Sequence, residues 1–230
     1  MTFAEKIISF YREVEYSGIL PKGISIMNPF RHNPDILPAI TQFYNKFYND
    51  NSPRHLILGI NPGRHGAGVT GIPFTDSKRL DDKCGLSITG IKTFETSSVF
   101  IYDMIEAFGG TEKFYGRFYI SSVSPLGFTS TGKNGNEVNY NYYDSRQLTE
   151  TVYDFMIASI EKQLNFGIKR DSCFCLGTGK NFKFIQELNN EKKYFGKVIP
   201  LEHPRFIMQY KSTKKQLYIS KYITELSSVL

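Results

Sequence analysis

The stretch HLILGINPGRHGAGVTGIPFTD, residues 55–76, decides the fold. Residues 56–60 are apolar or small and predict a short buried strand. Asn61-Pro62-Gly63 must end this strand, because proline lacks an amide hydrogen and glycine favours turns. Open α/β sheets bind their ligands where the carboxyl ends of strands open onto loops. We therefore expect Asn61 to belong to a functional site, although the glycines that follow are equally typical of simple turns.

The composition predicts one globular domain, residues 1–230, with a basic surface. Hydrophobic residues make up 40% of the 230 residues and aromatic residues 15%, which suits a substantial core. The formal net charge of +6 suits an anionic partner such as DNA. No run approaches the ~18 apolar residues of a membrane span, and the N-terminal segment carries charges that a signal peptide lacks. We therefore expect a cytoplasmic monomer with no membrane partner.

The three cysteines fit a reducing compartment. Cys173 and Cys175 alternate along an expected strand, so their side chains point to opposite faces and cannot bind one ion together. The cysteine count also excludes an iron–sulfur cluster held by four thiolates. We therefore expect neither a metal ion nor another cofactor.

Apolar segments with two different periodicities alternate along the chain. Helical spacing predicts helices at residues 3–16, 36–49, 96–108, 145–165, 182–188 and 212–226. Short apolar runs predict buried strands at residues 56–60, 117–123, 172–176 and 197–201, whereas residues 80–95 and 128–144 are expected to be loops. Such alternation predicts an α/β fold with a four-stranded, mainly parallel sheet between helices, because parallel strands need long crossovers. The carboxyl ends of the strands then bring Asn61, Ser122, Gly177 and His203 to one edge.

Two motifs resemble those of a known enzyme family. GINPG (residues 59–63), followed by TGIPF (residues 70–74), is similar to the first motif of the single-strand-selective monofunctional uracil-DNA glycosylases, above all of their divergent bacterial branch. LEHP (residues 201–204) resembles the second motif, except that the serine usual after His-Pro is Arg205 here. The resemblance implies a three-layer α/β/α sandwich and a DNA glycosylase that acts on a base flipped out of DNA.

The resemblance gives Asn61 and His203 separate catalytic roles. Breaking the glycosidic bond leaves positive charge on the sugar and negative charge on the base. His203 is expected to donate a hydrogen bond to a carbonyl oxygen of the base, and one such donor can contribute ~3–4 kcal/mol. Asn61 is expected to hold the attacking water. Because an asparagine supplies no negative charge, we expect a slower and more permissive enzyme than relatives with aspartate, and no lysine is placed for a lyase step.

The resemblance also implies a set of base-binding residues. Phe74 would stack on the base, worth ~1–3 kcal/mol, unless it only packs the core, and Gly63 lets the backbone approach the base. Ser122 aligns with an asparagine that reads the pyrimidine edge in the family. Its shorter hydroxyl has a single donor, which favours a looser pocket open to xanthine or hypoxanthine as well as uracil. Ile60 and Asn134 complete the set, although turn chemistry accounts equally well for Asn134.

Basic and apolar side chains near both motifs predict a DNA-binding surface. Contacts to DNA phosphates are expected from the basic residues Arg64, His65, Arg205, Lys211 and Lys214. Phe206 and Ile207, with Met208, are expected to form an apolar tip that fills the hole left by a flipped base. The alternative is that these three residues begin a buried segment.

The sequence therefore predicts a monofunctional DNA glycosylase of base excision repair, which hydrolyses the N-glycosidic bond of uracil and of other deaminated bases. One alternative is a non-catalytic damaged-DNA-binding module of the same fold, and the presence of both Asn61 and His203 argues against it. The other alternative is an α/β hydrolase acting on free nucleosides, which the basic surface and the apolar tip argue against.

Overall fold

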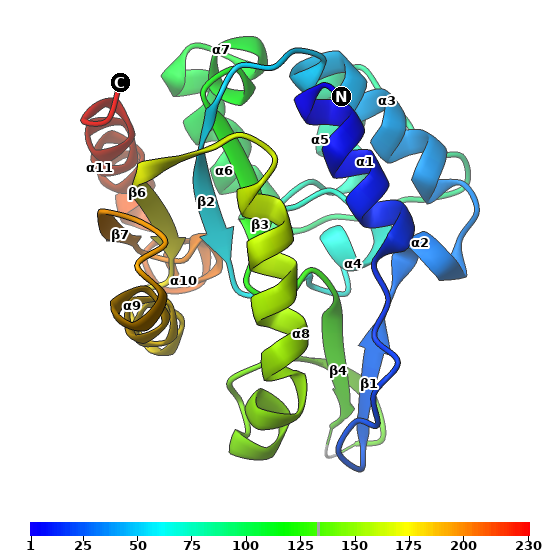
Figure 1. The fold of residues 1–230 in the computed structure, drawn as a ribbon. Helices are drawn as coiled ribbons and strands as arrows, with labels where there is room; N and C mark the ends of the chain where they lie inside the picture. Colours follow the sequence, from blue (N-terminus) through cyan, green and yellow to red (C-terminus); the bar gives the residue numbers. More distant parts are fainter. Residues whose placement is uncertain (133) are drawn as a thin grey trace.

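The computed structural model describes residues 1–132 and 134–230 and has a four-stranded parallel sheet at its centre (Figure 1). In spatial order its strands are β3 (Phe118–Ser122), β2 (Arg54–Gly59), β6 (Ile168–Leu176) and β7 (Lys197–Leu201). All three neighbouring pairs are parallel, which confirms the sheet predicted from the sequence. Gly59 pairs with Ser122, and Leu176 pairs with Leu201. The strands therefore end together at one edge.

Helices cover both faces of this sheet, as its apolar strands require. Every residue of β2 is buried, because a parallel strand between two helical layers has no solvent face. Figure 1 shows α8 (Arg146–Leu164) in front of the sheet and α6 (Thr96–Phe108) behind it. The other helices are α1 (Phe3–Glu13), α2 (Pro29–His32), α3 (Ile36–Tyr48), α4 (Ala67–Thr70), α5 (Ser77–Cys84), α7 (Thr111–Tyr115), α9 (Lys180–Lys192), α10 (Pro204–Tyr210), the 3-10 helix η1 (Ser212–Lys214) and α11 (Lys215–Ser227). None of the described helices is long and apolar enough to span a membrane.

A second, antiparallel sheet is absent from the sequence-based prediction. It consists of β1 (Ile24–Met27), β4 (Gly127–Thr131) and β5 (Glu137–Tyr140), in the order β1-β4-β5. The prediction of a loop at residues 128–144 is therefore wrong. The first two residues of β5 are exposed, and so is the last residue of β4. These strands therefore lack the apolar runs that identify a buried strand.

Two helices lie where the sequence predicted none. α5 occupies the start of the 80–95 segment, and its N-cap is Asp76, whose side chain accepts the amide hydrogen of Arg79. α10 begins at Pro204, where proline is well tolerated because the first amide of a helix has no partner within the helix. α10 therefore turns the segment after the His-Pro motif into a helix instead of an extended tip.

Candidate active site

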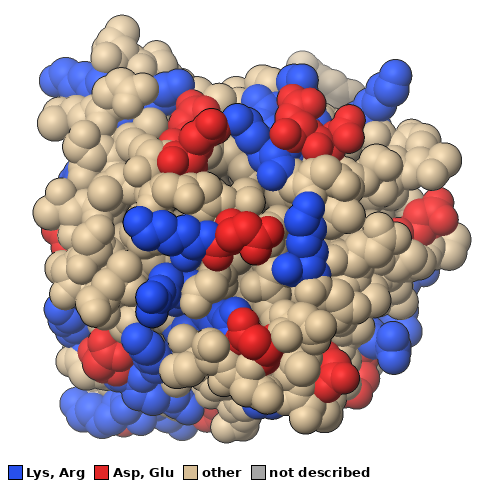
Figure 2. Space-filling view, turned by 90° about the horizontal axis from the view of Figure 1, so that it is seen from above, with Lys and Arg blue, Asp and Glu red and all other residues tan. Residues whose placement is uncertain are grey.

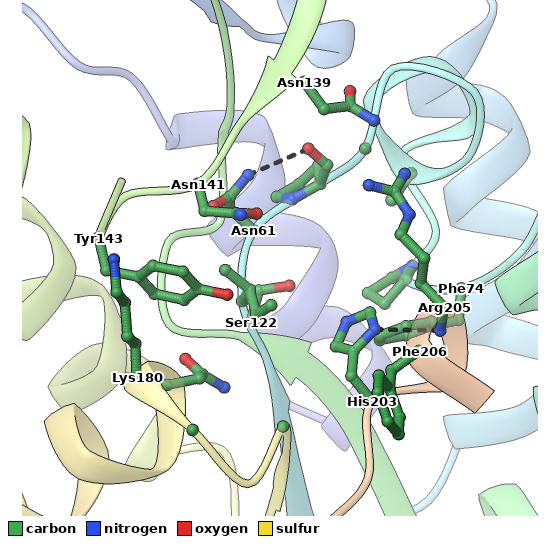
Figure 3. Close-up of a pocket in the computed structure, with 18 of the residues that line it drawn as sticks. Asn61, Phe74, Ser122, Asn139, Asn141, Tyr143, Lys180, His203, Arg205 and Phe206 are labelled. Atoms are coloured by element: carbon green, nitrogen blue, oxygen red, sulfur yellow. Dashed lines mark hydrogen bonds between the residues drawn. The ribbon is translucent and has the colours of Figure 1, made fainter. Parts of the chain in front are cut away.

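A cavity of about 280 Å³ opens at the carboxyl edge of the parallel sheet. Asn61 and His203 both line it, although they follow different strands and are far apart in the sequence (Figure 3). Of the residues predicted from the sequence, the cavity brings together Ile60, Asn61, Gly63, Phe74, Ser122, His203, Arg205 and Phe206. Its lining also includes residues that the sequence-based prediction did not name as site residues, among them Glu95, Asn139, Asn141 and Tyr143.

The side chain of Asn61 is held by the backbone that follows β5. Its Nδ2 donates to the carbonyl oxygen of Tyr140 at 3.2 Å, and its Oδ1 accepts the amide hydrogen of Tyr142 at 3.0 Å. These two bonds fix which end of the carboxamide is the oxygen. A carbonyl oxygen has two lone pairs, so Oδ1 keeps one for a further donor such as water. The second sheet therefore orients the amide at the end of β2.

His203 is the N-cap of α10 and is oriented by that helix. Its Nδ1 accepts the amide hydrogen of Arg205 at 3.1 Å, so a neutral imidazole carries its hydrogen on Nε2. Burial of the ring, together with the positive charge of Arg205, lowers the pKa of His203 to about 4. His203 is therefore neutral at physiological pH and offers an Nε2–H donor, while its Nδ1 is the acceptor for the Arg205 amide.

Phe74 lies beside His203 and is held in an unusual backbone conformation. The two ring centroids are 5.7 Å apart, and Phe74 has a φ of 52°, which non-glycine residues rarely adopt. A Cβ on Gly59 would lie 3.0 Å from the Phe74 ring, so glycine at that position leaves room for it. Phe74 both packs against the core and lines the cavity, so the two interpretations made from the sequence are compatible.

Ser122 and Tyr143 lie at the opposite side of the cavity from His203. Figure 3 shows the Tyr143 side chain pointing into the cavity towards Ser122. Burial raises the pKa of Tyr143 to about 12, so its phenol remains a donor at neutral pH. The ammonium of Lys180 lies 5.8 Å from the centre of the Tyr143 ring. Tyr143 follows β5, in the segment predicted to be a loop, and its neighbouring tyrosines gave no signal to single it out.

Two predicted site residues lie elsewhere. Ile207 is fully buried in the hydrophobic core, so it cannot belong to an exposed apolar tip, and the alternative of a buried segment is correct for it. The exposed pair on α10 is instead Phe206 and Tyr210, whose ring centroids are 5.6 Å apart. Asn134 is exposed near the turn between β4 and β5 and does not line the cavity. The cavity geometry therefore gives no support to the prediction that Asn134 contacts the base.

Of the basic residues predicted to bind DNA, Arg205 lines the cavity, and Arg64 and His65 directly follow Gly63, which also lines it. Partial burial lowers the pKa of His65, and the nearby charges of Arg64 and Arg205 lower it further, so these three residues share one region. Lys211 and Lys214 are exposed directly after α10. On the face over the amino ends of the strands, acidic and basic side chains are interspersed (Figure 2).

Comparisons with known proteins agree with this geometry. Residues 45–227 match the Uracil DNA glycosylase superfamily. The crystal structure of SMUG2 from Pedobacter heparinus is similar over 100% of this chain and 98% of that one, with 56% sequence identity and a TM-score of 0.97. No curated protein matches the chain. Both the expected family and the expected three-layer α/β/α fold are thus confirmed, and the chain belongs to the uracil DNA glycosylase superfamily, in its SMUG-like branch, and is a DNA glycosylase.

Proposed function

We propose that this glycosylase removes uracil and other deaminated bases, xanthine and hypoxanthine among them, after the nucleotide flips into the cavity. The observation that carries the proposal is the pairing of Asn61 and His203 in one cavity, with a free acceptor on the first and a free donor on the second. A base stacked in a duplex cannot reach a recessed site at the edge of a sheet, so the nucleotide must leave the stack.

The two residues act on opposite charges of the reaction. As the glycosidic bond breaks, its electron pair leaves with the base, and the Nε2–H of His203 donates to the base oxygen that carries the new charge. The neutral state of His203 means that it stabilises this charge as a hydrogen-bond donor and not as a cation. Oδ1 of Asn61 accepts a hydrogen bond from the water that attacks the sugar carbon.

The side chains of Ser122 and Tyr143 support the excision of several kinds of base. Ser122 offers one short hydroxyl and Tyr143 one phenolic donor, whereas an asparagine would present a paired donor and acceptor to a pyrimidine. Phe74 supplies an aromatic face, and stacking on it does not discriminate between bases. Ser122, Tyr143 and Phe74 therefore do not by themselves supply the paired groups that strict selection of uracil needs.

Binding of the surrounding DNA is assigned to the exposed residues around the cavity. Arg64, His65, Arg205, Lys211 and Lys214 would contact phosphates, and such contacts weaken as the salt concentration rises. Phe206 and Tyr210, 42% and 65% exposed, would fill the space left by the flipped base. We also propose that the protein acts as a monomer, because Asn61 and His203 already meet in one cavity within a single chain.

The test uses labelled oligonucleotides that contain a single uracil, xanthine or hypoxanthine. After incubation with the protein, alkali cleaves the strand wherever a base has been removed. Cleavage at all three bases supports the proposal, and cleavage at uracil alone would contradict the broad choice of bases. Gel retention without cleavage would identify a damaged-DNA-binding module, and release of base from free nucleosides but not from DNA would identify a nucleoside hydrolase.

A further inference from the structure

Glu95, the N-cap residue of α6, places a carboxylate in the wall of the cavity. Its side chain lies against the loop that follows β2. A Cβ built on Gly63 would lie 3.2 Å from Oε1, and one built on Gly66 would overlap Oε2. The backbone of Glu95 is also fixed, since its amide donates to Oδ2 of the fully buried Asp76 at 2.7 Å. The carboxylate therefore occupies space that the glycines of the first motif leave free.

The packing of α6 does not explain why this carboxylate is there. Glu95 makes no ion pair within 4 Å in the described part of the chain, and its one side-chain hydrogen bond is a long one, 3.4 Å, from Ser98. Arg205 of α10 attracts it from a greater distance, whereas Asp76, from the segment before α5, repels it. Burial is the main effect and raises the pKa of Glu95. A partly buried carboxylate with unused acceptor positions in a cavity is typical of a functional group.

A negative charge close to the sugar would favour the glycosylase reaction, and the first motif supplies none. As the bond to the base breaks, the sugar becomes cationic, and Asn61 can orient water but cannot supply charge. Glu95 lies beside Gly63, two positions after Asn61, and is the acidic side chain in the cavity lining. The lining of one cavity therefore holds a neutral amide from the first motif and, beside Gly63, a carboxylate from the N-cap of α6.

We propose that Glu95 supplies the charge that Asn61 lacks, by stabilising the cationic sugar as the glycosidic bond breaks. The electron pair of that bond leaves with the base. The water held by Asn61 adds its hydroxide to the sugar carbon, and its remaining proton goes to the departed base. Glu95 therefore stays ionised, and the enzyme ends unchanged. This inference rests on the proposed function, because it assigns Glu95 a part in the same hydrolysis.

The experiment compares single-turnover excision of uracil from a single-stranded oligonucleotide by the wild type, Glu95→Gln, Asn61→Asp and the Glu95→Gln/Asn61→Asp double variant. Glu95→Gln keeps the shape of the side chain and removes the charge, and we expect it to slow excision by roughly 10- to 100-fold. In the double variant the carboxylate returns on the first motif, and we expect most of the lost rate to return. Glu106→Gln is the matched control, since Glu106 lies on the same helix but is exposed and paired with Lys83.

The pH profile separates a charge effect from a structural one. The wild-type rate should fall as the pH drops through the raised pKa of Glu95, and this acid limb should vanish in Glu95→Gln. A wild-type rate in Glu95→Gln, or a loss without rescue by Asn61→Asp, would overturn the proposal. If Glu95→Gln fails to fold, the wild-type profile decides, because the absence of an acid limb contradicts the role. A wild type that excises no base from any of the oligonucleotides would instead refute the proposed function.

Discussion

At the amino edge of the central sheet, where β2 begins, buried polar side chains are bonded to one another. Arg54 is fully buried, pairs with Asp50 and donates from Nε to the carbonyl oxygen of Tyr115. Nδ1 of the buried His55 lies 3.2 Å from the hydroxyl of Ser172. At the carboxyl edge the same strand leads to Asn61, whose oxygen keeps a lone pair for the cavity. The polar groups at the amino edge are paired within the fold, whereas we propose that those at the carboxyl edge serve the reaction.

The two histidines sharpen this difference. His55 and His203 both have a lowered pKa, and burial is the main cause in each case. The ring of His55 packs against Phe118 in the core, 5.9 Å between centroids, whereas His203 faces the cavity beside Phe74. A lowered pKa is therefore common to both histidines, and access to the cavity is what singles out His203 as the proposed catalytic residue.

The largest effect is expected from His203→Ala, which removes the donor to the departing base. We expect single-turnover excision of uracil to fall by about 10²- to 10³-fold, the range found for loss of one such donor. The comparison predicts that His55→Ala, at the other edge, lowers the melting temperature and leaves the rate of the folded protein within a few-fold of wild type. Equal losses of excision rate in the two variants would contradict the assignment of His203 to catalysis and of His55 to stability.

Asn61→Ala should slow excision by about 10²-fold, because the attacking water loses its acceptor. The substitution also leaves the amide of Tyr142 without a partner, so a control for the position of the second sheet is needed. Asn139→Ala provides it, since Oδ1 of Asn139 accepts the amide hydrogen of Arg64 at 2.9 Å and joins the same sheet to the same loop. We expect Asn139→Ala to lose less than 10-fold. A similar loss in both variants would assign Asn61 a structural role only.

Arg54→Met should act on stability and not on catalysis. Removing the guanidinium breaks the pair with Asp50 and leaves the carbonyl oxygen of Tyr115 without its donor. Asp50 is half exposed and stays hydrated, so the main loss is the unpaired carbonyl, and we expect the free energy of unfolding to fall by roughly 1–3 kcal/mol. Urea denaturation measures the loss, and the excision rate at low temperature should remain that of wild type. A slow but fully stable variant would contradict the division between the two edges.

Ser122→Asn should change the preference among bases by roughly 10-fold, the size of one altered hydrogen-bonding set. The carboxamide restores a paired donor and acceptor, so the ratio of uracil to xanthine excision should rise. The measurement is the ratio of single-turnover rates on the two oligonucleotides. An unchanged ratio would show that Ser122 does not read the base, and Tyr143→Phe would then test the other donor on that side.

The smallest effect concerns the titration of His203. Because burial and Arg205 both disfavour the imidazolium, its pKa is about 4, and the ring stays neutral from pH 5 upwards. The excision rate should therefore show no change that follows a histidine of ordinary pKa near 6.5. An NMR titration of the imidazole measures this directly, and a value near 6.5 would mean that His203 can act as a cation.

The central sheet could be predicted from the sequence because each strand is a continuous apolar run that ends in a turn. The same feature located Asn61 and His203, since each directly follows such a run. The second sheet could not be predicted, because β4 and β5 are short and partly exposed, and β1 pairs with β4 far along the chain. Glu95 was missed for a related reason, since only the packing of α6 against the glycine loop brings it into the cavity.

The account depends most on the claim that a flipped base lies between Asn61 and His203. A crystal structure with single-stranded DNA containing 2′-fluoro-deoxyuridine, whose glycosidic bond resists hydrolysis, tests this directly. The account predicts uracil on the face of Phe74, an oxygen of the base within hydrogen-bonding distance of Nε2 of His203, and a water on Oδ1 of Asn61. A base bound outside this cavity, or one with neither residue within reach, would contradict it.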